Sequence, residues 1–266
     1  FVRSAATTSA TVASVTSTLV FFGACRGRPG PVSPRELIQG ALRGFLNPFL
    51  YYLVLLTAYS MLPAQVAMVV NYLWPLTLSI LAVPLLGQRL GGRALAGILV
   101  SFGGVALMAL TRGGTGGEVG AFPLFLALAS TVIWALYWVL NTRASGPAPV
   151  NLFFNFCFGT LYLAVWGIAA GMRVPADPGL LAGGVYIGVF EMGVTFLLWS
   201  TALKMSDNTS RISGLIYFTP FLSLGVIALA VREPIALSTL AGLLLVIVGV
   251  LIGGGLDKKP QRSIGV

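Results

Sequence analysis

The chain has 266 residues, of which 57% are hydrophobic and only 9% are charged, whereas about a quarter of an ordinary soluble domain is charged. It has no histidine, which removes the commonest general base and metal ligand. Its net charge of +9 comes from basic residues scattered between apolar segments, a pattern typical of cytoplasmic loops rather than of a nucleic-acid-binding surface. The composition predicts an all-α polytopic membrane protein in a lipid bilayer, with no cofactor, no metal site and no nucleic-acid partner.

Nine apolar segments are long enough to be membrane spans of about 20 residues. In chain order they cover roughly residues 5–25, 38–61, 64–86, 94–111, 119–141, 149–170, 179–203, 208–231 and 236–255. The Gly-rich run 113–120 lacks the Lys-Ser/Thr of a phosphate-binding loop, so it is predicted to be a linker. Cys25 and Cys157 lie in separate apolar segments and are predicted to be free thiols.

An internal repeat divides the chain. A shift of 145 residues places the run 71–75 (NYLWP) on the run 216–220 (IYFTP), so the span pair 64–111 recurs as 208–255. The predicted organisation is a first repeat over 1–112, a linker over 113–118, a second repeat over 119–256 and a cytoplasmic tail over 257–266. Since the second repeat has five spans and the first has four, symmetry predicts a further helix ahead of Phe1.

The charges give an independent prediction of topology. With that further helix counted as the first of ten, twelve of the 16 basic residues fall on one side of the membrane and four on the other. The positive-inside rule then places the C-terminus in the cytoplasm. Because five spans are an odd number, the two repeats have opposite orientations. Inverted repeats are characteristic of secondary transporters, whose substrate sites lie near the membrane midplane.

The run 71–75 is the most informative stretch. Pro75 removes a backbone hydrogen bond within a span, so the helix must bend or open there. Such a break is tolerated in a membrane only where the freed backbone is buried in protein or lines a wet cavity. On an ideal helix Tyr72 and Trp74 point about 160° apart, so either Pro75 distorts the turn or one ring packs against a neighbouring helix. Pro75 and its repeat partner Pro220 are the predicted hinges.

Tyr51, Tyr52 and Tyr217 lie near the centres of their predicted spans, too deep for the interfacial belt of aromatic residues. Their possible roles are therefore to line a cavity or to pack between helices. One helix face carries polar and aromatic residues at helical spacing and is expected to face the bundle interior: Ser130, Trp134, Tyr137, Trp138 and Asn141. The predicted substrate-binding residues are Tyr51, Asn71, Tyr72, Trp74, Trp134, Tyr137 and Tyr217.

Glu191 is the one acid in the middle of a predicted span. A carboxyl group there is expensive, so it is predicted to hold a substrate ammonium or a coupling proton. The alternative is a protonated carboxyl group bonded to a neighbouring helix. Gln88 and Glu233 lie at span ends, where caps or loop contacts are expected. Two series of small residues suit close helix contact: Gly97, Ser101 and Gly104, and Gly242, Gly249 and Gly253.

These stretches resemble the drug/metabolite transporter superfamily with EamA-like repeats, and within it the YddG-type aromatic amino-acid exporters. The resemblance rests on the runs 68–75, 87–88, 133–137 and 217–220. It implies ten helices in two inverted five-helix repeats and a central basket-like cavity. It also implies alternating access and export of Phe, Tyr and Trp, with other neutral amino acids as further substrates, across a bacterial inner membrane. Glu191 departs from the pattern of this subgroup.

Several alternatives stay open at this point. An aromatic cavity also suits other metabolites or hydrophobic cationic drugs. An intramembrane enzyme needs a nucleophile–base pair or a metal set, which the lack of histidine disfavours, and no catalytic residue is predicted. A channel is a third class. A monomer is expected, with an oligomer as the alternative, and the sequence leaves proton coupling and passive uniport equally open.

Overall fold

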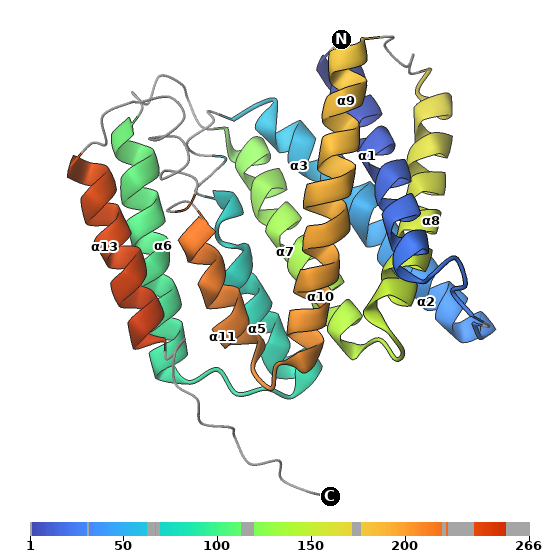
Figure 1. Cartoon of the computed structure of the whole chain (residues 1–266). Coiled ribbons are helices and arrows are strands. Elements are labelled where there is room, and N and C mark those ends of the chain that lie inside the picture. The colour runs from blue at the N-terminus through green and yellow to red at the C-terminus, as the bar shows by residue number, and fades with distance from the viewer. Residues whose placement is uncertain are drawn as a thin grey trace, which may run out of the picture. The chain divides into compact units, whose positions relative to one another are not determined.

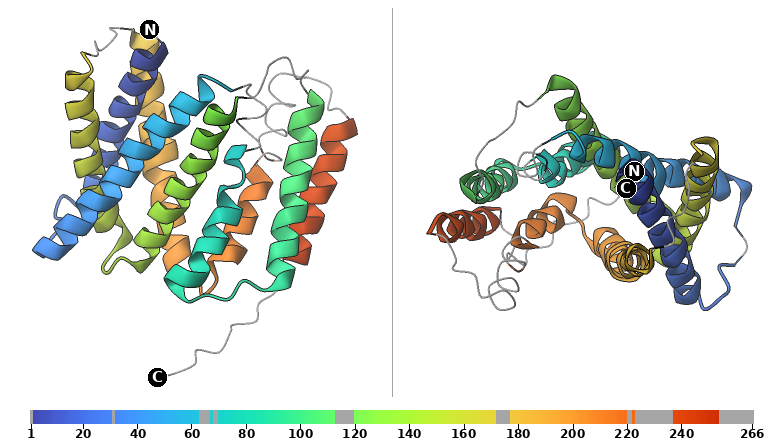
Figure 2. Two further views of the ribbon diagram at one scale, coloured as in Figure 1. Left: turned by 180° about the vertical axis from the view of Figure 1, so that it is seen from behind. Right: turned by 90° about the horizontal axis from the view of Figure 1, so that it is seen from above.

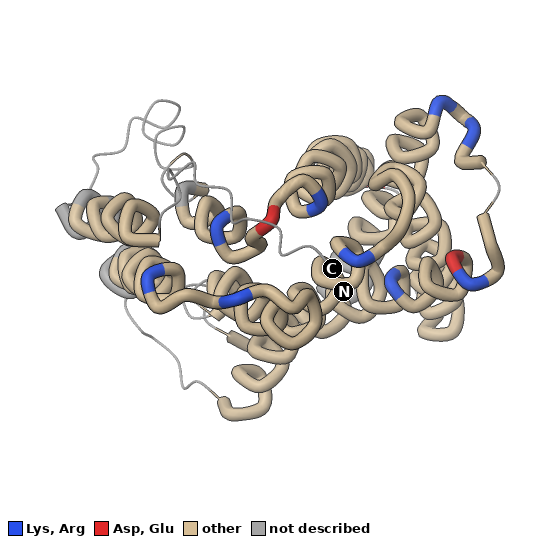
Figure 3. Tube along the Cα trace, turned by 90° about the horizontal axis from the view of Figure 1, so that it is seen from below, with Lys and Arg blue, Asp and Glu red and all other residues tan. Residues whose placement is uncertain are grey.

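The computed structural model describes residues 2–30, 32–62, 67, 70–112, 120–171, 177–219, 222 and 237–253, and the regular elements in this part of the chain are helices (Figure 1). Four stretches among these residues are long and apolar enough to cross a membrane: Pro34–Tyr59, Ala121–Arg143, Ala148–Ala169 and Pro178–Met205. The predicted all-α membrane fold is therefore confirmed. Basic residues lie in turns and near helix ends in the end-on view of Figure 3.

The chain forms two compact units that interleave in sequence. The first unit contains residues 1–60 and 136–204, and the second contains 61–135 and 205–266. Met61 and Met205, which begin the two segments of the second unit, correspond in the repeat after a one-residue slip. Each unit therefore combines matching segments from both repeats.

The first unit is built around α1 (Val2–Ala24) and α8 (Ala148–Ala169), which pack against each other. Two further stretches run through three elements each. One is α2 (Pro34–Gly44), η1 (Phe45–Leu50) and α3 (Tyr51–Tyr59), and the other is α9 (Pro178–Tyr186), η2 (Ile187–Val194) and α10 (Thr195–Met205). The η1 segment is a kink, in which Asn47 has extended backbone angles (φ −150°, ψ 128°) just ahead of Pro48, whereas η2 is π-helical. Both stretches therefore change backbone direction or register in mid-span.

Local capping explains where these stretches begin. Ser33 and Glu36 form a reciprocal capping box at the start of α2, and Pro34 occupies its first turn. At α9, the Asp177 carboxylate accepts a hydrogen bond of 2.9 Å from the Gly179 N–H. Proline at the first turn and an oxygen cap are the features that allow a helix to start sharply at the membrane edge.

The second unit contains α5 (Trp74–Leu86), α6 (Gly92–Arg112), α11 (Thr209–Gly214), η3 (Leu215–Phe218) and α13 (Leu237–Ile252). Helix α7 (Ala121–Arg143) contributes its first part to this unit and its last part to the first unit.

Helices α6 and α13 lie side by side in both views of Figure 2. A Cβ atom on Gly97 would collide with the backbone at Gly249, and one on Gly104 with the carbonyl of Gly242. The predicted close contact through small residues is therefore confirmed. The Ser101 hydroxyl donates to the carbonyl of Val246 at 3.3 Å, its partner under the 145-residue repeat.

Gln88 forms the cap that its position predicts, since its side-chain oxygen accepts a 2.9 Å hydrogen bond from the Thr209 N–H at the start of α11. Both cysteines are free, as predicted. The predictions for Pro220, Glu233 and the linker 113–118 fall outside the described residues.

Candidate functional site

The helix is interrupted at the run 71–75, as the proline predicts. Tyr72 and Leu73 form a turn, in which the Leu73 N–H donates to the carbonyl of Val70 at 3.0 Å, and α5 begins at Trp74. Pro75 is buried in the first turn of α5, where its missing N–H costs least. Because proline has no N–H, the Asn71 carbonyl cannot receive the usual helical hydrogen bond from position 75.

The Tyr72 and Trp74 rings diverge from this break. Tyr72 packs against the buried cluster of Ile98, Val105, Tyr217 and Val246, and its ring lies 6.3 Å from the Tyr217 ring. The Trp74 ring meets the Trp134 ring edge-on, with centroids 6.2 Å apart and planes at 73°. The structure shows both predicted alternatives, since the turn at Tyr72 and Leu73 is distorted and the Tyr72 ring packs against the neighbouring Tyr217 cluster.

Exposure separates these residues into two groups. Tyr217 is fully buried, and its hydroxyl donates to the Tyr72 carbonyl at 3.0 Å, so it supports the backbone at the break. Asn71, Trp74 and Trp134 are half-buried and keep surface on which a ligand could pack. Two indole rings in contact can bind the ring of an amphipathic molecule, and an amide such as that of Asn71 can bind its polar end.

The first unit holds the remaining candidates. Tyr51 is buried, with its ring 5.0 Å from that of Tyr52. Tyr137 is fully buried, and its hydroxyl lies 3.5 Å from the Asn155 side-chain nitrogen. Glu191 is exposed within η2. A carboxyl group with exposed surface inside a membrane span is available to a cation.

The polar and aromatic face predicted for residues 130–141 is buried on α7 except at Trp134, which is half-buried. Ser130 and Tyr137 are 0% exposed, and Asn141 is 1% exposed. The predicted site residues thus fall into two sets, one in each unit. The set in the second unit is Asn71, Tyr72, Trp74, Trp134 and Tyr217, and the set in the first is Tyr51, Tyr137 and Glu191.

Sequence reasoning missed a cluster of buried polar groups in the first unit. Arg43, which is one of the twelve basic residues counted on the predicted cytoplasmic side, is only 4% exposed and contacts Asn151 and Asn155. A signal was available in the four-residue spacing of the two asparagines, which places them on one face of a helix.

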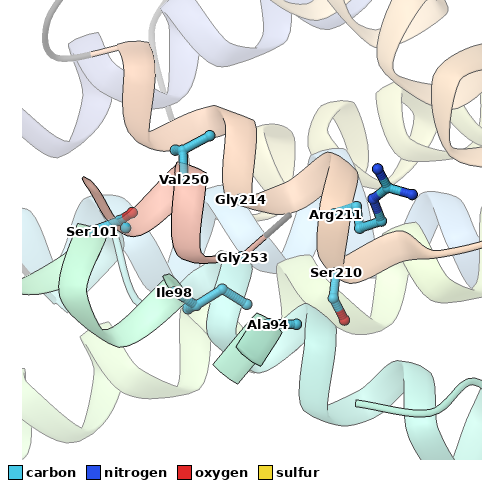
Figure 4. A pocket seen from close by; sticks show the side chains of 9 residues that line it. Ala94, Ile98, Ser101, Ser210, Arg211, Gly214, Val250 and Gly253 are labelled. Carbon is cyan, nitrogen blue, oxygen red and sulfur yellow. The ribbon is translucent and has the colours of Figure 1, made fainter. Parts of the chain in front are cut away.

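A small pocket in the second unit is too small for an amino acid. It lies among α6, α11 and α13, with Ser101 and Ser210 in its wall (Figure 4), and holds about 20 Å³, which is room for about one water molecule. In the described ranges no three His, Cys, Asp or Glu side chains gather as a metal site would need.

The chain is a multi-pass helical membrane protein. Its sequence repeat, its interleaved units and its helix interrupted at the aromatic run 71–75 are features typical of a transporter. The profile of the EamA-like transporter family matches residues 2–110 and 121–253, and the chain belongs to that family. An uncharacterised transporter of Bacillus subtilis, YvbV, is 25% identical over 230 residues, covering 83% of this chain and 73% of YvbV.

The aromatic amino acid exporter YddG of Ancylobacter novellus is 28% identical over 222 residues, or 80% of this chain and 73% of the exporter. The YddG exporter of Escherichia coli is 26% identical over 194 residues, or 69% of this chain and 64% of the exporter. A solved crystal structure at 23% identity shares the fold, with a TM-score of 0.76 over 95% of this chain and 89% of that chain.

Proposed function

We propose that the protein is a secondary transporter that exports aromatic amino acids, and other neutral amino acids as further substrates, across a bacterial inner membrane by alternating access. The observation that carries the proposal is the pair of half-buried indoles, Trp74 and Trp134, beside the interrupted backbone at Asn71. Similarity to YddG exporters at 26–28% identity supports the same substrate class.

In this proposal the two indoles bind the substrate ring edge-on and over their faces, because aromatic rings attract one another in both geometries. The Asn71 amide donates to the substrate carboxylate or accepts from its ammonium group. Pro75 and Pro220 serve as bending points, since a helix interrupted at a proline can absorb backbone rotation. The other predicted substrate contacts are Tyr51, Tyr72, Tyr137 and Tyr217. Of these, Tyr72 and Tyr217 are better placed to stabilise the interrupted backbone than to contact the substrate.

The test is counterflow of labelled phenylalanine in proteoliposomes. We expect Trp74→Ala and Trp134→Ala each to raise the half-saturating phenylalanine concentration about 10-fold, as loss of a central aromatic anchor does at other binding sites. Trp166→Ala is the matched control, because Trp166 is 45% exposed on α8 and suits the interfacial belt. Undiminished counterflow in both Trp74→Ala and Trp134→Ala would contradict the assignment of these two indoles to the substrate-binding site.

Glu191 supports a second candidate function. An exposed carboxyl group within a span would attract a cation, so hydrophobic cationic drugs form the alternative substrate class. Competition experiments separate the two classes, because an amino-acid exporter is inhibited by neutral amino acids and a drug exporter by hydrophobic cations.

A further inference from the structure

Arg43 is a buried cation held by neutral groups. Its Nε donates to the Asn155 side-chain oxygen at 3.0 Å, and its Nη2 donates to the Asn151 side-chain oxygen at 3.2 Å. The third guanidinium nitrogen, Nη1, makes no hydrogen bond to any described residue. Since a guanidinium group carries five N–H donors in a rigid fork, this arrangement leaves donors available to a further acceptor.

The two amides are fixed with their oxygens toward Arg43. The Asn155 nitrogen donates to the Asn141 side-chain oxygen at 2.8 Å, and the Asn151 nitrogen donates to the Ser145 carbonyl at 2.7 Å. If either amide were reversed, its NH2 group would face the N–H groups of the guanidinium, and no hydrogen bond could form between them. The network therefore holds the Arg43 side chain in one orientation, and a preorganised donor binds an anion at a lower entropic cost.

The surroundings of Arg43 carry more positive than negative charge. Glu36 is the nearby carboxylate, but it is engaged by the Ser33 N–H at 2.9 Å, the Ser33 hydroxyl at 2.7 Å and the Ser145 hydroxyl at 3.3 Å. Lys204 adds a second cation, whose Nζ donates to the carbonyls of Ala144 and Gly146 at 2.9 and 2.8 Å. A buried guanidinium without a carboxylate partner is costly, and an anion would relieve that cost.

Arg43 also lines a pocket of about 320 Å³ in the first unit, a volume at the lower end of small-molecule sites. The polar wall contains Arg28, Glu36, Arg43, Ser145 and Asn151, and the apolar wall includes Val32, Val150 and Phe154. Its lining comes largely from the segments just outside Pro34 and between Arg143 and Ala148, which are ends of membrane-spanning stretches. The pocket therefore belongs at the level of the lipid headgroups.

We propose that this pocket binds a phosphate group at the membrane surface. An arginine fork matches the oxygens of a phosphate, and the apolar wall suits the glycerol and first methylenes of a phospholipid. Glu36 repels anions, but it repels a singly charged phosphodiester less than free phosphate, part of which is doubly charged at neutral pH. An anionic phospholipid should therefore bind more tightly than inorganic phosphate.

The test uses the purified full chain, delipidated in a neutral detergent and titrated with phosphatidylglycerol, phosphatidylcholine or inorganic phosphate, with binding followed by native mass spectrometry. Phosphatidylglycerol is expected to bind more tightly than phosphatidylcholine. Arg43→Gln should weaken phosphatidylglycerol about 10-fold, the usual effect of losing a charge-assisted hydrogen bond. Arg28→Gln should weaken it several-fold, and because Arg28 is exposed, this variant tests the pocket even where Arg43→Gln fails to fold.

The matched control is Arg35→Gln, which removes an exposed arginine from the first turn of α2, outside the pocket lining. Equal affinity for phosphatidylglycerol in the wild type and in both pocket variants would overturn the proposal, as would equal weakening in Arg35→Gln. Displacement of the lipid by inorganic phosphate, with the same sensitivity to Arg28→Gln, would support the pocket and assign its ligand to a soluble phosphate instead.

Discussion

At the residue scale, Pro75 explains the roles of its neighbours. A proline at the start of α5 interrupts the backbone, and the Tyr217 hydroxyl donates to the Tyr72 carbonyl within the interrupted turn. Tyr72 and Tyr217 are repeat partners, so the two repeats meet each other at this point. Trp74 has no aromatic partner in the repeat, because Thr219 stands at the equivalent position. Specificity is therefore expected to reside in Trp74 rather than in the tyrosine pair.

Glu191→Gln tests which substrate class the protein serves. Loss of the carboxylate should weaken inhibition of phenylalanine counterflow by tetraphenylphosphonium roughly tenfold, because the attraction between opposite charges is lost. Competition by unlabelled tryptophan should change little if the indoles carry recognition of the ring.

The matched control is Asp207→Asn, which removes an exposed acid from the turn before α11. Equal loss of tryptophan and tetraphenylphosphonium competition in Glu191→Gln would instead assign Glu191 to the ammonium group of the amino acid. No change in either competition would exclude it from substrate binding.

The sequence predicts the break at Pro75 but not the directions of the rings beside it. A missing N–H is a local property, visible from the residue type alone. The packing of Tyr72 against Tyr217 depends on a helix 145 positions away, and an ideal helix offers no means of choosing between the two rings. Arg43 was missed for a related reason, since its burial depends on asparagines of α8.

At the element scale, the kink in η1 and the π-helical turn η2 occupy equivalent places in the repeat. The shift of 144 residues that pairs Met61 with Met205 also pairs Asn47 in η1 with Glu191 in η2. Both residues are polar and both lie in mid-span. For Glu191, the π-helical turn around it is a feature that frequently marks a functional site. The hydropathy pattern located both spans, but it contains no information on a change in backbone register within them.

Adjacent glycines on α6 provide a sharp test of the α6–α13 contact. A Cβ atom at Gly104 would collide with the carbonyl of Gly242, whereas one at Gly103 would meet nothing within 4 Å. Gly104→Ala should therefore destabilise the protein by about 1–3 kcal/mol through overpacking, seen as a lower apparent melting temperature in detergent. Gly103→Ala, the control, should be neutral or slightly stabilising, because alanine favours a helix. Equal melting temperatures for the two variants would contradict the close approach of these helices.

At the scale of the whole molecule, the repeat and the compact units do not coincide. The sequence predicts two repeats in succession, whereas each compact unit takes corresponding segments from both. Sequence periodicity identifies which segments are related, but not which of them pack together, because packing depends on complementary surfaces such as the glycines of α6 and α13. Four of the predicted spans, 38–61, 119–141, 149–170 and 179–203, correspond to described stretches long and apolar enough to cross a membrane, because length and apolarity are set by the membrane itself.

Membrane topology is the remaining prediction at this scale. The excess of basic residues on one side predicts a cytoplasmic C-terminus, and α8 then has its N-terminal end inside and its C-terminal end outside. Two exposed positions, Ala170 after α8 and Asp207 after α10, should therefore lie on opposite sides of the membrane. In a background with Cys25→Ser and Cys157→Ala, a membrane-impermeant maleimide should label Ala170→Cys in intact cells. Asp207→Cys should be labelled only after permeabilisation. The opposite pattern would reverse the orientation, and the proposed direction of export would then need to be measured anew, because the positively charged side would face outward.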